Sequence, residues 1–258
     1  MAVLLGTVAL EPNRWGTLDP SGAPSTRLSE WLDEIAAAGF DGIELWDRHL
    51  TAVPNDEVDA IVDHPLPVTV FNSYVDLDDA DPTERVREAH WVDRARSEAV
   101  KFNVGARPEL AAAYAERVAR WVDVMPAGVR LLCECHEGTI AEDPRVAAEL
   151  LDRAGPPERV QAIVHTHEPV EGLRQRFDAY GERISHVHVN FLDGSLHAPA
   201  LHDVRGRLGA TVDLLRAAGF DGSWTVEFVQ GVLTDDDRPE LLVRRAAEDL
   251  RVLREVVG

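Results

Sequence analysis

Two distant stretches of the chain share one pattern: LDEIAAAGFDGIELW (Leu32–Trp46) and VDLLRAAGFDGSWTVEF (Val212–Phe228). Each starts as an amphipathic helix, passes through AAGFDG and continues as a run of residues that reaches a glutamate. Gly39 and Gly219 stand where a helix ends in a left-handed residue. The pattern therefore predicts a helix–strand unit that is repeated along the chain.

Short apolar runs alternate with helical patterns through the rest of the sequence, which indicates βαβ units and a parallel sheet. Eight runs in 258 residues fit a closed (β/α)₈ barrel, a TIM barrel of the α/β class, with residues 1–258 as a single domain. A doubly wound open sheet would repeat the same unit, but no glycine-rich phosphate loop follows the first run. The runs are Val3–Leu10, Gly42–Trp46, Val68–Tyr74, Val100–Val104, Val129–His136, Val160–His165, Ile184–Asn190 and Ser223–Val229.

The composition excludes some classes of partner. The formal charge is −20, from 26 Lys and Arg against 46 Asp and Glu, which argues against nucleic acid and anionic membranes. The first residues lack the charged segment of a signal peptide, and no apolar run reaches the length of a membrane span. We therefore expect a cytoplasmic protein with a small-molecule substrate. Self-association into a homo-oligomer stays open.

The two cysteines, Cys133 and Cys135, are separated by one residue on a predicted strand. This spacing disfavours a disulfide between them, because no turn brings the two thiols together. Their parity is opposite to that of Glu134, so we expect both to face the helices. A thiolate metal site is the less favoured alternative.

Catalytic residues of such barrels project from the carboxyl ends of the strands. Four consecutive runs offer metal-ligand side chains there, and Glu227, flanked by apolar residues, is costly to bury unless it is paired or metal-bound. Mixed Glu and His ligands suit Mn²⁺, Zn²⁺, Co²⁺ or Fe²⁺ better than Ca²⁺. The candidates are Glu134 and His136 in the fifth run, His165 and His167 in the sixth, His186 and His188 in the seventh, and Glu227 in the eighth.

Strand parity separates the roles within each pair. Residues two apart face the same way, so one member of a pair can bind a metal while its neighbour binds substrate or lies deeper. His186 comes early in its run, so we expect it to pack inside the barrel or to support a ligand.

These segments resemble the xylose isomerase-like barrel superfamily, also described as the sugar phosphate isomerase/epimerase family. GIELW, CECHEGT, HVHVNF and GSWTVEF carry the resemblance, which runs from Ala37–Trp46 to Gly219–Phe228. Members bind one divalent metal ion through Glu, Asp, His and Glu from strands five to eight. Carried over by position, the resemblance implies the ligands Glu134, His165, His188 and Glu227.

The sixth strand departs from the family pattern, because His165 stands where relatives have Asp. Two readings follow. If His165 binds the metal, the site has two Glu and two His ligands and favours Zn²⁺ or Fe²⁺ relative to Mg²⁺. Otherwise the ligand is lost or replaced by His167, and the site is weakened or altered.

The resemblance also implies a reaction and substrate contacts. Glu134 and Glu227 would move a proton next to the carbonyl of a sugar, sugar phosphate or related polyol, as an isomerase or epimerase. The same intermediate in a dehydratase or lyase, or a non-catalytic or partner-dependent barrel with an altered metal site, are the alternatives. The abasic-DNA endonucleases of the superfamily need further His and Asp ligands that we do not find. The expected substrate-binding residues are Glu44, Trp46, His136, His167 and, in the 193–209 loop that relatives use to bind or cover substrate, Arg205.

Overall fold

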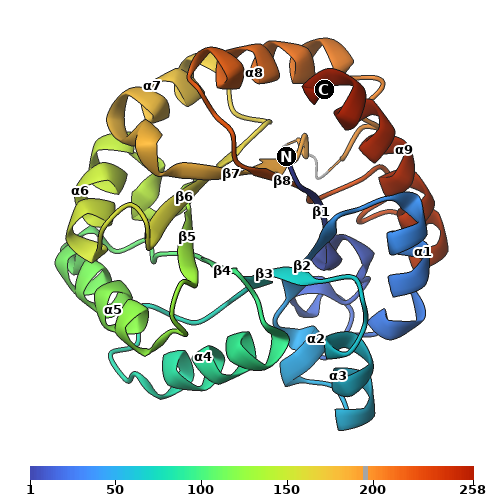
Figure 1. Ribbon diagram of the computed structural model, residues 1–258, viewed down its shortest axis with the longest axis horizontal. Helices are drawn as coiled ribbons and strands as arrows, with labels where there is room; N and C mark the ends of the chain where they lie inside the picture. The colour runs from blue at the N-terminus through green and yellow to red at the C-terminus, as the bar shows by residue number, and fades with distance from the viewer. Residues whose placement is uncertain (194–196) are drawn as a thin grey trace.

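The computed structural model describes residues 1–193 and 197–258, which form a closed barrel of eight parallel strands in the order β1 to β8, with β1 paired to β8. Figure 1 looks along this barrel and shows the strands as an inner ring surrounded by the helices. The (β/α)₈ prediction is confirmed. The strands are β1 Val3–Gly6, β2 Gly42–Trp46, β3 Val68–Asn72, β4 Ala99–Phe102, β5 Arg130–Glu134, β6 Val160–His165, β7 Ile184–Val189 and β8 Ser223–Val226.

Helices cover the outside of the barrel. Between strands they lie in the predicted alternation, with α2 and α3 as an extra pair after β2 and α9 closing the ring next to α1. None of the described helices is both long enough and apolar enough to cross a membrane. The α-helices are α1 Leu32–Ala38, α2 Arg48–Thr51, α3 Asn55–Val62, α4 Thr83–Ala95, α5 Ala111–Val124, α6 Pro144–Ala154, α7 Val170–Tyr180, α8 Arg205–Ala217 and α9 Pro239–Val257.

The repeated GFDG segment makes the same helix-to-strand turn twice. Gly39 ends α1 with φ of 100° and Gly219 follows α8 with φ of 79°, the left-handed conformation that glycine tolerates best. The second glycine of each copy stands where the following strand begins, close to a backbone carbonyl of an adjacent segment. A Cβ on Gly42 would lie 2.9 Å from the Pro67 carbonyl oxygen, and one on Gly222 would lie 2.1 Å from that of Ser185. Both glycines of the motif are therefore required by backbone geometry.

The first strand is shorter than predicted. Residues Thr7–Leu10 form a 3₁₀ turn, because the Thr7 hydroxyl, in place of a backbone carbonyl, accepts the N–H of Trp46. Arg205, expected in a loop, is the first residue of α8. The rest of the 193–209 loop includes residues 194–196, which lie outside the described residues.

Two cores stabilise the barrel. The larger lies between strands and helices and includes Cys133 and Cys135, both free thiols, which confirms that they face the helices without a disulfide. The smaller fills the barrel interior, and we call it the apolar floor. On β4 to β6, its residues stand two positions before Lys101, Glu134 and His165, so it lies directly beneath a polar layer. The floor consists of Leu4, Val70, Ala99, Leu132 and Ile163.

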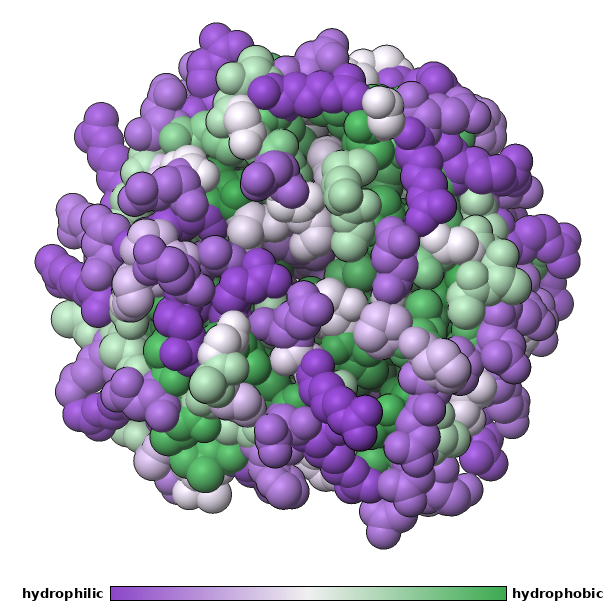
Figure 2. All heavy atoms as spheres, in the orientation of Figure 1, coloured by the Kyte–Doolittle hydropathy of each residue, from purple (hydrophilic) through white to green (hydrophobic). Residues whose placement is uncertain are grey.

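Hydrophilic side chains cover much of the face in Figure 2, and hydrophobic ones show between them, in keeping with the acidic composition.

Candidate functional site

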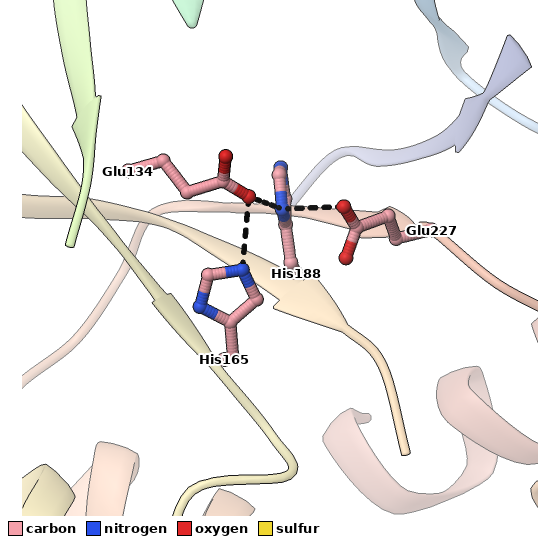
Figure 3. A group of neighbouring side chains, drawn as sticks. All are labelled: Glu134, His165, His188 and Glu227. Atoms are coloured by element: carbon pink, nitrogen blue, oxygen red, sulfur yellow. Dashed lines mark hydrogen bonds and ion pairs between the residues drawn. The ribbon is translucent and has the colours of Figure 1, made fainter. Parts of the chain in front are cut away.

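Four side chains converge at the carboxyl ends of β5 to β8. Glu134 and His165 are the last residues of β5 and β6, His188 is the penultimate residue of β7, and Glu227 directly follows β8. All four are buried, and one potential ligand atom from each lies within 4.8 Å of the others. Figure 3 shows the two carboxylates on either side of the His188 ring, with His165 beneath Glu134. These are the four residues that the family resemblance implies as metal ligands.

The imidazole nitrogens lie close to carboxylate oxygens. His165 Nε2 is 3.0 Å from Glu134 Oε1, and His188 Nδ1 is 3.2 Å from the same oxygen and 3.3 Å from Glu227 Oε1. His188 Nδ1 is buried but is not aligned for a hydrogen bond to either carboxylate. An imidazole nitrogen between two carboxylate oxygens is a donor set that suits a divalent cation, which would bind there in exchange for the imidazole proton. The residues present therefore fit a metal ion.

Glu44 supports this cluster from inside the barrel. Its Oε2 lies 3.0 Å from His188 Nε2 and accepts a 2.9 Å hydrogen bond from Thr225, while its Oε1 accepts one of 3.1 Å from Asn72. Contact with Glu44 at Nε2 turns Nδ1 of His188 toward the two carboxylates, which is the orienting role that carboxylates serve behind histidine ligands. Glu44 thus lies where it can hold the site, beneath the ligand atoms.

His186 is fully buried and stands two residues before His188 on β7, so it lies on the same face of the strand but deeper in the barrel. Its ring nitrogens are 2.7 Å from the Ser223 hydroxyl and 2.8 Å from the Thr225 hydroxyl, and Nε2 is 3.4 Å from Glu44 Oε2. His186 therefore occupies the deep position expected from its place in the strand.

Lys101 and Asn190, which contact the two carboxylates of the cluster, were not singled out from the sequence. Lys101, on β4, is 2% exposed and places its Nζ 2.5 Å from Glu134 Oε2 and 4.8 Å from the centre of the Tyr74 ring. Asn190, after β7, donates a 2.9 Å hydrogen bond to Glu227 Oε2. The available signal for Lys101 was its place as the only lysine, inside the apolar run AVKF.

The charges of the cluster stabilise one another. Burial raises the pKa of Glu134, but Lys101 and the histidines outweigh it and hold that pKa well below its usual range. Burial likewise raises the pKa of Glu227, but His188 lowers it below the ordinary value. Burial lowers the pKa of His188, but Glu44 and Glu227 hold it well above the usual range. The cluster therefore keeps its carboxylates ionised and holds positive charge between them.

A cavity of about 330 Å³ opens above the cluster, at the small end of the range for small-molecule sites. Three aromatic side chains form one wall: Trp15 Nε1 donates a 3.1 Å hydrogen bond to the Tyr74 hydroxyl, and Trp15 meets Phe228 edge-on at 5.8 Å between ring centres. Trp15 is 48% exposed and adopts φ of 57°, uncommon for a residue other than glycine. The cavity is lined by Trp15, Tyr74, Lys101, Asn103, Glu134, His136, Glu137, His165, His167, Asn190, Glu227 and Phe228.

The expected substrate-binding residues divide into two groups. His136 and His167 line the cavity, and burial together with His165 lowers the pKa of His167 to about 4, so its imidazole is neutral near pH 7. Trp46 is buried in the helix-side core, with its ring 5.6 Å from that of His49, and does not line the cavity. Arg205 pairs with Glu255 of α9 at 2.6 Å. The structure therefore does not bring Trp46 or Arg205 together with the cluster, and Glu44, also expected to bind substrate, lies beneath the cluster and is not among the described residues that line the cavity.

Comparison with known proteins assigns a family model, described as xylose isomerase-like TIM barrel, to residues 32–256. Among solved structures, a xylose isomerase-like TIM barrel/4-hydroxyphenylpyruvate dioxygenase fusion protein has a TM-score of 0.68 at 18% identity, over 99% of this chain. The chain covers 42% of that fusion protein, less than half of its length.

Two further structures match over nearly the whole of both chains. The IolI protein, solved with a bound zinc atom, matches with a TM-score of 0.65 at 17% identity. The match covers 99% of this chain and 96% of the IolI chain. A sugar phosphate isomerase/epimerase from Parabacteroides distasonis matches with a TM-score of 0.61 at 12% identity. The match covers 100% of this chain and 96% of that protein. At these identities the structures establish the shared fold. No curated protein matches the chain.

Proposed function

Because the chain belongs to the xylose isomerase-like TIM barrel family, we propose that it is a divalent-metal-dependent isomerase or epimerase that moves a proton next to the carbonyl of a sugar-like substrate. The observation that carries the proposal is the convergence of Glu134, His165, His188 and Glu227 at the mouth of the barrel. His165 lies in this cluster at the position where relatives have Asp, which supports the reading that it is retained as a metal ligand.

The proposed ligands of the metal are those four residues. A bound divalent ion would polarise the carbonyl and hydroxyl oxygens of the substrate and stabilise the negative charge that develops on them. Two carboxylates and two imidazoles favour Mn²⁺, Zn²⁺, Co²⁺ or Fe²⁺. The zinc atom bound by the structurally similar IolI protein supports this choice of metals.

Glu134 and Glu227 are the proposed proton-transfer groups. They flank His188 and line the same cavity, so a substrate carbon between them is within reach of a base on either side. Asn190 orients Glu227, and Lys101 orients Glu134. His136 and His167 are proposed to bind substrate hydroxyls from the cavity wall.

We propose that the protein works in the cytoplasm on a small molecule, as one domain over residues 1–258.

Metal analysis of purified protein tests the first half of the proposal. We expect about one divalent ion per chain in the wild type and strongly reduced metal in the Glu134→Gln/Glu227→Gln double variant. His197→Gln is a matched control, because its side chain lies outside the four-residue cluster. Equal metal content in wild type and double variant would contradict the proposed ligands.

Proton exchange tests the second half. Incubation of metal-loaded protein with candidate ketoses in D₂O should place deuterium on the carbon next to the carbonyl, as seen by NMR. Glu227→Gln should abolish this labelling, because the variant loses a residue that is proposed both as a base and as a metal ligand. Absence of labelling on every ketose tried would refute the isomerase/epimerase proposal.

A further inference from the structure

The cavity above the cluster contains little free positive charge. Its twelve lining residues comprise three aromatics, three histidines, three glutamates, two asparagines and one lysine. Lys101 is therefore the only fixed cation among the described residues that line it. A site for a phosphate group usually supplies arginine or lysine side chains, or the N–H groups at a helix start.

Lys101 is not available to an anionic ligand. Its Nζ lies 2.5 Å from Glu134 Oε2, and it is 2% exposed beneath the Tyr74 ring. The ammonium group thus already has a carboxylate partner, and binding a phosphate would require that pair to separate. Separation would leave Glu134 buried without its main counter-charge, which is strongly unfavourable.

The remaining charges oppose an anion as well. Glu134, Glu137 and Glu227 give three negative charges on the lining against the single charge of Lys101. A divalent ion held by Glu134 and Glu227 would bring this sum to zero, with no positive excess. Among the arginines outside the lining, Arg205 pairs with Glu255, and Arg207 stacks on Phe191 at 5.0 Å. The charge of the pocket therefore suits a neutral ligand.

The amide, imidazole and aromatic part of the lining is well suited to a polyol. Asn103, Asn190, His136 and His167 offer hydrogen-bond donors and acceptors, and the Trp15, Tyr74 and Phe228 rings offer an apolar wall. We propose that the site selects an uncharged polyhydroxylated carbonyl compound and discriminates against its phosphate ester. This inference rests on the proposed function and narrows its substrate class.

Calorimetry with unreactive ligands tests the selectivity separately from catalysis. The probes are three matched pairs that lack a carbonyl: xylitol and its 5-phosphate, glucitol and its 6-phosphate, and myo-inositol and its 1-phosphate. In every pair that binds metal-loaded protein, we expect the neutral member to bind at least about tenfold more tightly, because an unpaired phosphate loses its hydration. Inorganic phosphate alone should not bind in the cavity.

A variant that adds positive charge to the lining makes the test specific to the pocket. Asn103→Arg adds a cation to the lining and should reduce or invert the preference in the same pairs. Arg107→Ala, at an exposed arginine that pairs with Glu109, is the control and should leave the preference unchanged. Tighter binding of the phosphate ester in any pair, or no binding by any neutral member, would overturn the inference.

These outcomes are distinguishable from failure of the proposed function. Metal content and deuterium exchange report on the cluster and its bases. The polyol pairs have no carbonyl and therefore no exchangeable proton next to one, so they report on charge selection alone. A protein that holds metal and exchanges protons but prefers phosphate esters would refute only the inference drawn from the pocket.

Discussion

Replacing Lys101 with methionine should destabilise the protein by about 3 kcal/mol. Removing one partner of a buried ion pair costs roughly 3–5 kcal/mol, because the other charge stays buried without compensation. Glu134 would keep its contacts with His165 at 3.0 Å and His188 at 3.2 Å, which places the expected loss at the low end of that range. Methionine fills most of the lysine volume, so little of the loss should come from a cavity.

Urea unfolding of metal-free protein in the presence of a chelator measures this loss. The matched control is Arg120→Met, which breaks an Arg–Glu pair whose side chains are 71% and 62% exposed and should cost under about 1 kcal/mol. The double variant Lys101→Met/Glu134→Gln should be less destabilised than the sum of its two single variants, because the uncompensated charge is gone.

The loss should also depend on pH. Lys101 helps to hold the pKa of Glu134 below its usual value, so the stability from this shift is present above the unfolded pKa of about 4.5 and is lost as pH falls through the folded pKa. The gap between wild type and Lys101→Met should therefore be largest near pH 7 and shrink in acid. A Lys101→Met variant within about 1 kcal/mol of wild type at pH 7 would refute the claim that this pair holds the site together.

Four further predictions concern other features. His165→Asp should shift metal preference toward Mg²⁺ and Mn²⁺ relative to Zn²⁺, as measured by competition between metals, because a carboxylate replaces an imidazole. Burial raises the pKa of Glu88 to about 8, so wild-type stability should fall as pH rises from about 4.5 to 8. Glu88→Gln should reduce that slope, to which Asp47 and Asp249 with pKa values raised by burial to about 6 and about 7 also contribute, and should be the more stable protein at pH 9 in urea titrations. Gly42→Ala should cost roughly 1–3 kcal/mol, because its Cβ would meet Thr69 Oγ1 at 2.4 Å. Gly209→Ala, in open space on α8, should instead raise the melting temperature.

Much of the fold and the centre of the site could be predicted from sequence because both depend on short-range patterns. The GFDG glycines mark the helix-to-strand turns, and strand parity separates Glu134 from its neighbouring cysteines. Parallel strands then bring their ends together at one rim of the barrel. These facts place the seven strand-end candidates at one rim, and the family resemblance then narrows them to the four residues that converge.

The residues that sequence reasoning missed or placed wrongly depend on side-chain contacts that the local sequence pattern does not specify. Lys101 meets Glu134 across the β4–β5 pair, and nothing in the run AVKF specifies that partner. Trp46 is the last residue of β2, but its ring packs against His49, on the helix after β2. Arg205 finds Glu255, which lies on another helix and far along the chain. Parity predicts the side of a strand, but the partner beyond it is set by packing.

The apolar floor lies beneath the polar residues that line the cavity, and it can be altered by simple changes of volume. Its five members are hydrocarbon side chains that donate and accept no hydrogen bonds, so exchanging one for another of different size orphans no polar atom. Shortening Leu132 or Ile163 would open space under Glu134 or His165, and enlarging Ala99 would press upward on Lys101. Natural variation or laboratory evolution could therefore retune the depth of the pocket, and with it the length of the ligand accepted, from a layer that takes no part in the chemistry.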